Sequence, residues 1–278
     1  MYFDRVKTEI GLNPLDKNPC RLLDFAKLVL EPGGECEANT GEHEALLVVL
    51  SGQADIAACG VEYAAVGGRA NVFSGRAHAV YLPPGCAYRV SVPRSGQRFE
   101  AAIPMAKAED GSQPFLITPD QVRTGKWGIS NFSRTFFQIL VKGQHPTHQI
   151  SRLIVGETLT PSGNWATYPP HRHEHDDPPR EVFMEEMYYF RVAPNDGWGL
   201  AKYYTDDGSI DEAYTIKDDT ILMMPKGYHT VVSAPGYTTY YLWFLAGNTR
   251  TQATVDDPNV GWVARTIPII RNIEENLS

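Results

Sequence analysis

Short apolar segments, separated by glycine and proline, recur along most of the chain. Several are rich in Val, Ile, Tyr, Phe and Thr: HEALLVVL (43–50), HAVYLPP (78–84), EMYYFRV (186–192), TILMMP (220–225) and TTYYLWFLAG (238–247). Segments of this length and composition, bounded by turn residues, are typical of β-strands. Their number predicts a β-sandwich or barrel rather than alternating strands and helices. One short helix is expected near TPDQVRTG (118–125), where Thr-Pro is a helix start signal.

Two stretches of the chain resemble each other. VYLPPGCAYRVSVP (80–93) aligns with LMMPKGYHTVVSAP (222–235) at a constant offset of 142 residues, which also brings Glu44 onto Glu186. Repeats of this kind indicate repeated structural units. We therefore predict two similar β-domains in tandem, comprising residues 1–120 and 121–278.

The repeat is unequal in its candidate chemistry. At the offset of 142, the second half has His171, His173 and His229. The first half has Val29, Glu31 and Ala87 at the matching positions. If histidines bind a metal, only the second half does so, and the first domain lacks metal ligands.

Alternating histidines in PPHRHEH (169–175) raise the possibility of a metal site. Residues two apart on a strand point to the same side, so His171 and His173 project together. Glu186 opens the next apolar strand, and His229 follows a Pro-x-Gly turn. Three imidazoles and one carboxylate suit Zn, Mn, Fe, Ni or Co and leave positions open for a substrate. We predict these four residues as metal ligands.

Competing interpretations remain for several of these residues. HxH alone also fits a polar strand face, and His229 alone fits a core or turn position. Glu185 is the alternative to Glu186, which the duplicated glutamate at 44 and the strand alternation favour. His175 fits a fourth imidazole, a group behind the ligands, or, as we prefer, a surface residue.

Composition and charge restrict the possible partners. The chain of 278 residues is 42% hydrophobic and 21% charged, which is typical of a globular protein, and no apolar run reaches the ~20 residues of a membrane span. A net charge of −8 argues against nonspecific nucleic-acid binding. We expect no nucleic-acid or membrane partner. An anionic substrate would need local Lys or Arg.

The cysteines and the first residues bear on location. All four cysteines lie in the first third of the chain without a CxxC pair, which favours reduced thiols in a cytosolic protein. The opening MYFDRVKTEIGL lacks the features of an export signal. We expect a cytoplasmic protein, and the exposed edges of β-domains favour a homo-oligomer.

The order HxH, Glu, PxG, His resembles the cupin superfamily, whose members are small antiparallel barrels and are often duplicated. GNWATYPPHRH, MEEMYYFRV, MPKGYHTVV and APGYTTYYLWFLAG resemble the 5-deoxy-glucuronate isomerase family of bicupins in bacterial myo-inositol catabolism, as does GGRANVFSGRAHAVYLPPG in the first half. The similarity extends over nearly the whole chain. It implies tandem double-stranded β-helix barrels with few short helices. It also implies His171, His173, Glu186 and His229 as ligands of a divalent metal, Zn foremost.

The resemblance implies an aldose–ketose isomerase that converts 5-deoxy-D-glucuronate to 5-dehydro-2-deoxy-D-gluconate. Such an enzyme needs Lewis-acid stabilisation and a general base, which the sequence does not identify. Strand alternation puts Tyr188 on the ligand face, where it either donates a proton or only lines the barrel. The substrate carboxylate calls for a cation, for which Lys202, Arg172, Arg191 and Lys226 are candidates near the motifs in sequence.

Alternatives to this isomerase are a related uronate isomerase, an Fe-dependent dioxygenase and a non-enzymatic sugar-acid-binding bicupin. Two positions depart from the family pattern. His175 stands where an acidic or polar loop residue is expected, and Trp243 stands where asparagine is expected.

Overall fold

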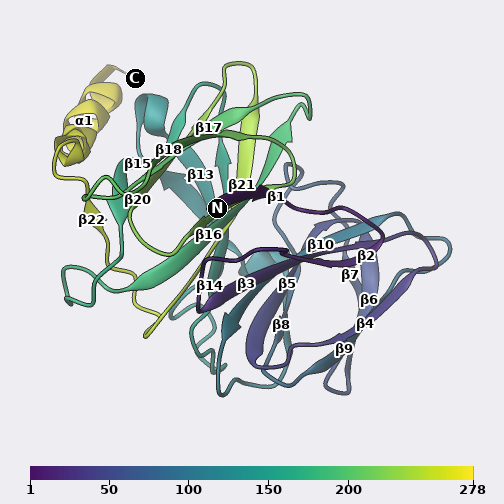
Figure 1. Cartoon of the computed structure of the whole chain (residues 1–278). Coiled ribbons are helices and arrows are strands. Elements are labelled where there is room, and N and C mark those ends of the chain that lie inside the picture. The colour runs from purple at the N-terminus through teal and green to yellow at the C-terminus, as the bar shows by residue number, and fades with distance from the viewer. Residues whose placement is uncertain (278) are drawn as a thin grey trace.

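The computed structural model of the protein describes residues 1–277, and nearly all of its regular structure is β-strand (Figure 1). The strands form four sheets of seven, six, five and four strands. Large and small sheets face each other in pairs and enclose two barrels that lie side by side. The prediction of an all-β fold with tandem barrels is confirmed.

The first barrel pairs a six-stranded sheet with a four-stranded sheet, and neighbouring strands are antiparallel. The six-stranded sheet has the order β11 (Phe115–Ile117), β8 (Ala79–Leu82), β5 (His43–Ser51), β10 (Phe99–Lys107), β3 (Leu23–Leu30), β2 (Gly11–Pro14). The four-stranded sheet has the order β4 (Glu35–Asn39), β9 (Ala87–Ser91), β6 (Gln53–Ala58), β7 (Val61–Gly67).

The second barrel repeats this plan with extra strands at the sheet edges. Its seven-stranded sheet has the order β1 (Phe3–Arg5), β19 (Thr220–Met224), β16 (Met184–Ala193), β21 (Thr238–Gly247), β14 (Ile154–Thr160), β13 (Arg134–Leu140), β12 (Arg123–Trp127). Its five-stranded sheet has the order β18 (Asp211–Ile216), β17 (Gly199–Tyr204), β20 (Tyr228–Ser233), β15 (Trp165–Arg172), β22 (Val255–Asp256). The shared central orders, β8-β5-β10-β3 and β19-β16-β21-β14, support the predicted duplication.

Strand membership changes between residues 117 and 123, because β11 pairs with the first barrel and β12 with the second. The short β1, however, pairs with β19 of the second barrel. The first strand therefore lies across the predicted boundary at residue 120, which stays a prediction.

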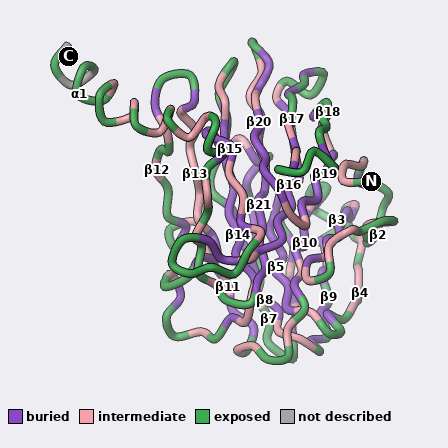
Figure 2. The backbone as a smooth tube through the Cα atoms, turned by 60° about the vertical axis from the view of Figure 1, so that its left-hand side comes forward, coloured by how far each residue is buried: buried purple, intermediate pink, exposed green. Residues whose placement is uncertain are grey.

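Helices lie outside the sheets. They are three 3-10 helices, Pro119–Gln121, Ser130–Phe132 and Gly261–Thr266, and one α-helix, α1 (Ile267–Leu277). The first is the helix expected after Thr118, whereas α1 was not predicted. Figure 2 shows α1 projecting from barrels whose buried positions concentrate in the facing strands. Within residues 1–277, no helix combines the length and the apolar character that crossing a membrane requires.

The apolar residues divide into three cores. One fills each barrel, and the third lies between the two large sheets, where it joins the barrels to each other. Successive side chains of β16 point alternately into two of these cores. Tyr188 and Phe190 belong to the second barrel, whereas Met187 and Tyr189 belong to the core between the barrels. Burial of side chains of this size contributes about 1.5–3 kcal/mol each, so the third core holds the two barrels together as one unit.

Two buried glutamates, which we call the clamp glutamates, tie each barrel to the start of a strand in the other. Glu44 on β5 accepts hydrogen bonds from the backbone N–H groups of residues 151–153 at 2.6–2.9 Å, and from the Tyr81 hydroxyl at 2.7 Å. Glu185 on β16 accepts them from the N–H groups of residues 21–23 at 2.7–3.3 Å. These segments lead into β14 and β3. Each carboxylate therefore satisfies donors that burial would otherwise leave without partners.

The clamp glutamates correct one sequence inference. Residue 45, directly after Glu44, lies opposite Leu82, and Glu186 lies opposite Met224. Leu82 and Met224 match at the offset of 142, so the counterpart of Glu44 is Glu185 and not Glu186. The constant offset conceals a shift of one residue between β5 and β16. Duplication of Glu44 is consequently no argument for Glu186 as a ligand.

The predicted counterparts of the HxH histidines are also wrong. Ala87 matches His229 at the offset of 142. Asn39 on β4 lies opposite Ala87, just as His171 lies opposite His229. Asn39 is therefore the counterpart of His171. Val29 and Glu31 lie in β3 and just after it, and β3 corresponds to β14. The conclusion that the first barrel has no histidine at this position is unchanged.

Two ion pairs with buried cations cross between the barrels. Arg69 is buried and its Nη2 lies 2.6 Å from Oε1 of Glu157. Lys27 is buried and its Nζ lies 2.7 Å from Oδ1 of Asp219. Both pairs join a cation of the first barrel to a carboxylate of the second.

Lys27 and Glu157 occupy equivalent positions in the two barrels. Ala106 lies opposite Glu44, and Ala246 lies opposite Glu185. Strands β10 and β21 therefore correspond at an offset of 140. Lys27 lies opposite Ala102, and Glu157 lies opposite Leu242, which is 140 residues later. The same place in the fold is thus a cation in one barrel and an anion in the other.

One expectation about the cysteines is wrong. Cys59 and Cys86 form a disulfide with their Cα atoms 5.3 Å apart, while Cys20 and Cys36 are free. Cys59 lies in the turn after β6, and its N–H donates to the carbonyl of Ala87 at 2.9 Å. The pairing of β6 with β9 brings the two residues together. The spacing of 27 residues in the sequence gave no sign of this contact.

Candidate metal centre

A local irregularity in β15 sets the direction of the HxH histidines. Pairing with β20 shifts register between Ala166 and His171, where the sequence is TYPP. Thr167 has a left-handed backbone with φ of 57°. This conformation costs a β-branched residue about 1–3 kcal/mol. After the irregularity, His171 lies opposite His229, and strand pairing itself brings the two imidazoles together.

Four side chains meet inside the second barrel: His171, His173, Glu186 and His229. One nitrogen or oxygen atom from each lies within 4.8 Å of the others. The Nε2 atoms of His173 and His229 each lie 3.0 Å from Oε2 of Glu186. Three of the four residues are buried, and His171 is half-buried. The group predicted from the sequence motifs is therefore assembled from β15, the residue just after its end, β16 and β20.

The polar contacts of this group fit a cation. His173 bonds through Nδ1 to the carbonyl of Met184 at 2.6 Å, which fixes the ring and leaves Nε2 directed at the group. His229 is fully buried, and neither of its ring nitrogens makes a hydrogen bond within residues 1–277, although its Nε2 lies 3.0 Å from Oε2 of Glu186. A buried nitrogen without a hydrogen bond is costly, and a bound metal would satisfy Nε2. This cluster can hold a metal ion.

The charges within the cluster influence one another. Burial by itself would raise the pKa of Glu186, but the adjacent His229 and His173 hold that pKa well below its ordinary value. Burial by itself would lower the pKa of His173, yet the hydrogen bond and charge of Glu186 raise it. Burial, reinforced by His229 and His173, lowers the pKa of His171. Glu186 is thus ionised at neutral pH and can serve as an anionic ligand.

The neighbouring candidates lie elsewhere. Glu185 points to the opposite side of β16, where it is a clamp glutamate. His175 is exposed on the loop after β15, and its backbone N–H donates to Glu181 at 3.1 Å. The preference for a surface position of His175 agrees with this placement.

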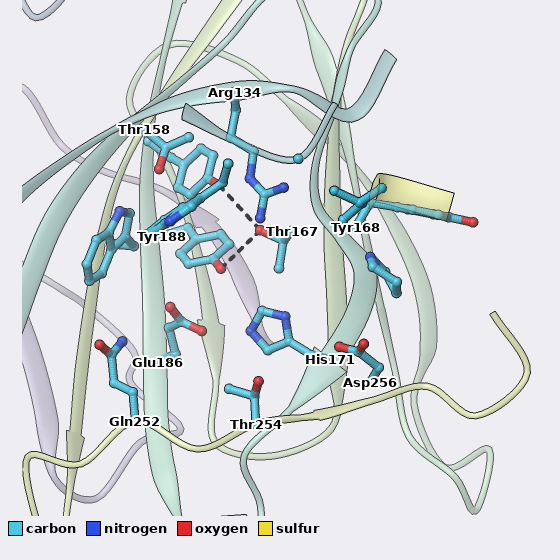
Figure 3. Close-up of a pocket in the computed structure, with 16 residues that line it drawn as sticks. Arg134, Thr158, Thr167, Tyr168, His171, Glu186, Tyr188, Gln252, Thr254 and Asp256 are labelled. Carbon is cyan, nitrogen blue, oxygen red and sulfur yellow. Dashed lines mark hydrogen bonds between the residues drawn. The ribbon is translucent and has the colours of Figure 1, made fainter. Parts of the chain in front are cut away.

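A cavity of about 460 Å³ opens beside the four side chains (Figure 3). Its lining comprises Trp127, Gly128, Arg134, Thr158, Thr167, Tyr168, Pro169, His171, Glu186, Tyr188, Tyr241, Trp243, Gln252, Thr254, Asp256 and Ile267. Aromatic walls with a few polar groups are typical of small-molecule sites. The volume lies in the range found for such ligands.

Hydroxyl groups line the middle of the cavity. Thr167 Oγ1 lies 3.4 Å from the Tyr188 hydroxyl and 3.3 Å from the Tyr241 hydroxyl. Burial, and next the charge of Glu186, raises the pKa of Tyr188 well above its ordinary value. Tyr188 therefore stays protonated at neutral pH and can donate a hydrogen bond to a ligand.

Trp243, one departure from the family pattern, forms part of the wall. Its ring covers Gly156 on the adjacent strand so closely that a Cβ on Gly156 would lie 2.2 Å from it. Only glycine at 156 leaves room for this ring. The indole nitrogen of Trp243 is buried without a hydrogen-bond partner in the described chain.

None of the four cations proposed from the sequence lines the cavity. Arg172 pairs with Asp206, and Lys202 pairs with Asp211. Arg191 lies 3.1 Å from Glu100, and Lys226 is also outside the lining. Sequence proximity to the motifs was therefore a poor guide to the cation.

Arg134 and Asp256 line the cavity and were missed. Arg134 stands on β13, well before the motifs, and its only sequence signal is a charge at the start of the apolar run RTFFQIL. Asp256 lies opposite His171 on the two-residue strand β22. No pattern in the sequence distinguishes Asp256 from its neighbour Asp257.

Two similar barrels in tandem, with three histidines and a glutamate inside one of them, define a bicupin with a single candidate metal centre. The profile of the KduI/IolB family matches residues 8–263. The chain belongs to this family.

Curated relatives are similar over most of their length. The chain is 36% identical over 240 residues to a 5-deoxy-glucuronate isomerase of Geobacillus kaustophilus strain HTA426, covering 86% of this chain and 84% of that protein. It is 30% identical over 242 residues to a 5-deoxy-glucuronate isomerase of Bacillus subtilis strain 168, covering 87% of both.

Solved structures agree with the fold. The structure of an IolB-like protein from Salmonella typhimurium LT2 matches with a TM-score of 0.87 and 26% identity, covering 95% of this chain and 99% of that one. An oxalate decarboxylase from Lactobacillus farciminis in complex with formate matches with a TM-score of 0.65 at 9% identity, covering 100% and 94%. The second likeness concerns the fold alone.

Proposed function

We propose that this protein is a metal-dependent aldose–ketose isomerase that converts 5-deoxy-D-glucuronate to 5-dehydro-2-deoxy-D-gluconate, a reaction of myo-inositol catabolism. Curated relatives named 5-deoxy-glucuronate isomerase align with most of the chain. The observation that carries the proposal is the buried group of three histidines and a glutamate beside a cavity lined by hydroxyls. Neither a dioxygenase nor a binding protein is favoured by the relatives.

His171, His173, Glu186 and His229 are the proposed ligands of a divalent metal, for which Zn is our first candidate and Mn, Fe, Ni or Co the alternatives. The metal would supply Lewis-acid stabilisation of the negative charge that develops on the sugar oxygens. The Nε2 of His229, which makes no hydrogen bond although it lies beside the Glu186 carboxylate, supports this assignment.

The conversion removes a proton from C2 of the aldose and returns a proton to C1, while a hydroxyl proton moves from O2 to O1. Asp256 is the one carboxylate besides Glu186 among the described lining residues, and although it is an exposed residue, partial desolvation at the cavity wall raises its pKa above the ordinary value. We assign it the transfer between the carbons. Tyr188 is assigned the role of proton donor to a sugar oxygen.

An assay with purified protein and 5-deoxy-D-glucuronate tests the proposed function. We expect the ketose to form without oxygen uptake, and to incorporate deuterium at C1 when the reaction runs in D₂O. Removal of the metal by a chelator should abolish turnover, and adding back Zn should restore it. Oxygen consumption with turnover would indicate a dioxygenase, and saturable binding without conversion would indicate a binding protein.

Separate substitutions test the two assigned proton-transfer groups. Asp256→Asn should lower kcat by about 10²- to 10³-fold, because general acid–base groups contribute on this scale. Tyr188→Phe should lower kcat by about 10²-fold, since it removes the assigned proton donor and keeps the ring. Both variants should retain the metal, as measured by elemental analysis. A kcat within twofold of the wild type would contradict the assignment for that residue.

We further propose that the protein forms a homo-oligomer. Three large apolar side chains near the C-terminus, Trp262, Ile269 and Ile273, are 52–61% exposed. Exposed apolar side chains close together favour association. Light scattering should give a mass that is a multiple of 30.9 kDa. We expect the mass of a Trp262→Ser, Ile269→Ser variant to fall toward that of one chain, whereas a monomeric wild type would contradict the proposal.

A further inference from the structure

Arg134 is a cation that lines the cavity and has no carboxylate partner in the described part of the chain. It extends from β13 toward the lumen of the second barrel, and Figure 3 shows it at the opposite end of the pocket from Glu186. Its Nη1 donates to the carbonyl of Phe132 at 3.3 Å, and the guanidinium lies 5.7 Å from the centre of the Trp127 ring. Its Nε is buried and has no hydrogen-bond partner within residues 1–277.

Several buried or half-buried cations of the described chain are paired. Lys27, Arg69 and Arg191 each lie within 3.1 Å of a carboxylate oxygen, whereas no ion pair within the described residues includes Arg134. The half-buried Arg152 and Arg250 also lack an ion pair, but they donate to backbone carbonyls and do not line the cavity. A desolvated cation without a partner is unfavourable unless a ligand supplies the anion. Burial also lowers the pKa of Arg134, which agrees with a charge that lacks an anionic neighbour.

We propose that Arg134 binds the carboxylate of the substrate and so directs the opposite, aldehyde end toward His171, Glu186 and the rest of the metal centre. The inference rests on the proposed function, because that function supplies a substrate with a carboxylate at one end and the reacting carbons at the other. The planar guanidinium suits this anion, since its N–H groups can meet both carboxylate oxygens.

Neighbouring donors support this orientation. Thr158 Oγ1 and Trp243 Nε1 line the same cavity, are buried and have no hydrogen-bond partner in the described chain. Figure 3 shows Thr158 close to the Arg134 end, with Thr167 between Arg134 and His171. The cavity thus offers a cation at one end, hydroxyls along its middle and the metal centre at the other. This sequence of groups matches a polyhydroxylated acid lying lengthwise.

The local cation also answers a problem of charge. The chain carries a net charge of −8, which repels an anionic substrate. A single cation in the cavity wall offsets this repulsion at the binding site, because electrostatic interactions are stronger in a low-dielectric cavity than in water. It also gives the site a means to reject neutral sugars of similar size.

The test compares two substrates with two proteins. The substrates are 5-deoxy-D-glucuronate and its neutral analogue with a carboxamide in place of the carboxylate. We expect the wild type to prefer the acid by about 100-fold in kcat/KM, the scale of a charged hydrogen-bonded contact. Arg134→Gln should lose about 100-fold on the acid, mostly through KM, and little on the amide, so that the preference disappears. Arg134→Lys should recover part of it.

Arg123→Gln is the matched control, because Arg123 is an exposed arginine on β12, the strand that pairs with β13. Metal content and melting temperature should be the same in all variants. A merely structural role would lower turnover of both substrates equally and leave the preference intact, which would overturn the inference. Absence of turnover of the acid by the wild type would instead overturn the proposed function, and this inference with it.

Discussion

Replacing Glu186 by glutamine is expected to remove the metal and to lower kcat/KM by about 10³-fold or more. The substitution keeps the shape of the side chain and removes the one anionic ligand, on which two histidines converge at 3.0 Å. Loss of Lewis-acid stabilisation costs several kcal/mol of transition-state energy, which corresponds to this factor. Elemental analysis and steady-state kinetics on the same preparation measure the two effects together.

The same cluster predicts how metal binding depends on pH. Because the pKa of His173 is raised in the metal-free site, protons compete for this imidazole from a higher pH than for an ordinary histidine. Metal affinity should therefore fall as the pH is lowered. A Glu186→Gln protein that retains both metal and turnover would contradict the proposed ligand set.

Replacing the adjacent Glu185 by glutamine is expected to lower the stability of the protein and to leave its metal content unchanged. This clamp glutamate accepts hydrogen bonds from the backbone of residues 21–23 in the other barrel, and it is 1% exposed. Glutamine removes the charge and presents an N–H₂ group to these donors. We expect the free energy of unfolding to fall by about 3 kcal/mol, because buried donors then lose a charged acceptor. Urea unfolding measures the change, while the metal content of the folded protein should remain that of the wild type.

Glu44 provides a matched variant for this prediction. It has the same role in the first barrel and belongs neither to the four ligand side chains nor to the cavity lining, so Glu44→Gln should cost a similar amount. Glu62→Gln, at an exposed position on β7, should change stability by less than about 0.5 kcal/mol. If Glu185→Gln is as stable as Glu62→Gln, the clamp glutamates do not join the barrels as we describe.

Much of this architecture was predictable from strand periodicity. A period of two puts His171 and His173 on one face and separates Glu186 from Glu185, and turn residues mark where each strand ends. The resemblance of the motif order to the cupin superfamily then implies which strands meet. Local pattern was sufficient here because all four residues lie in or beside strands of one barrel.

The remaining features depend on contacts that no local pattern records. The counterpart of Glu44 was misassigned because a constant offset cannot show a one-residue shift between β5 and β16. Such a shift is visible only in the ladder with a neighbouring strand. Arg134 was missed because β13 joins the sheet from outside the motif region. Its proposed role rests on its place in the cavity and on the absence of a carboxylate partner within residues 1–277, which are properties of the packed structure.

The ion pairs between the barrels have a consequence for how the halves recognise each other. Lys27 and Glu157 are equivalent in position and opposite in charge, and their partners are Asp219 and Arg69. If two second halves packed together through this face, Glu157 would take the place of Lys27 and meet Asp219. Two first halves would likewise bring Lys27 against Arg69.

Both self-pairings therefore place like charges together in a buried interface, at a cost of several kcal/mol, whereas the unlike pairing satisfies both contacts. The charges at this interface therefore favour pairing of a first half with a second half over pairing of two identical halves. A first half is thereby directed to pack against a second half and not against another first half, which sets the order of the barrels in the folded protein.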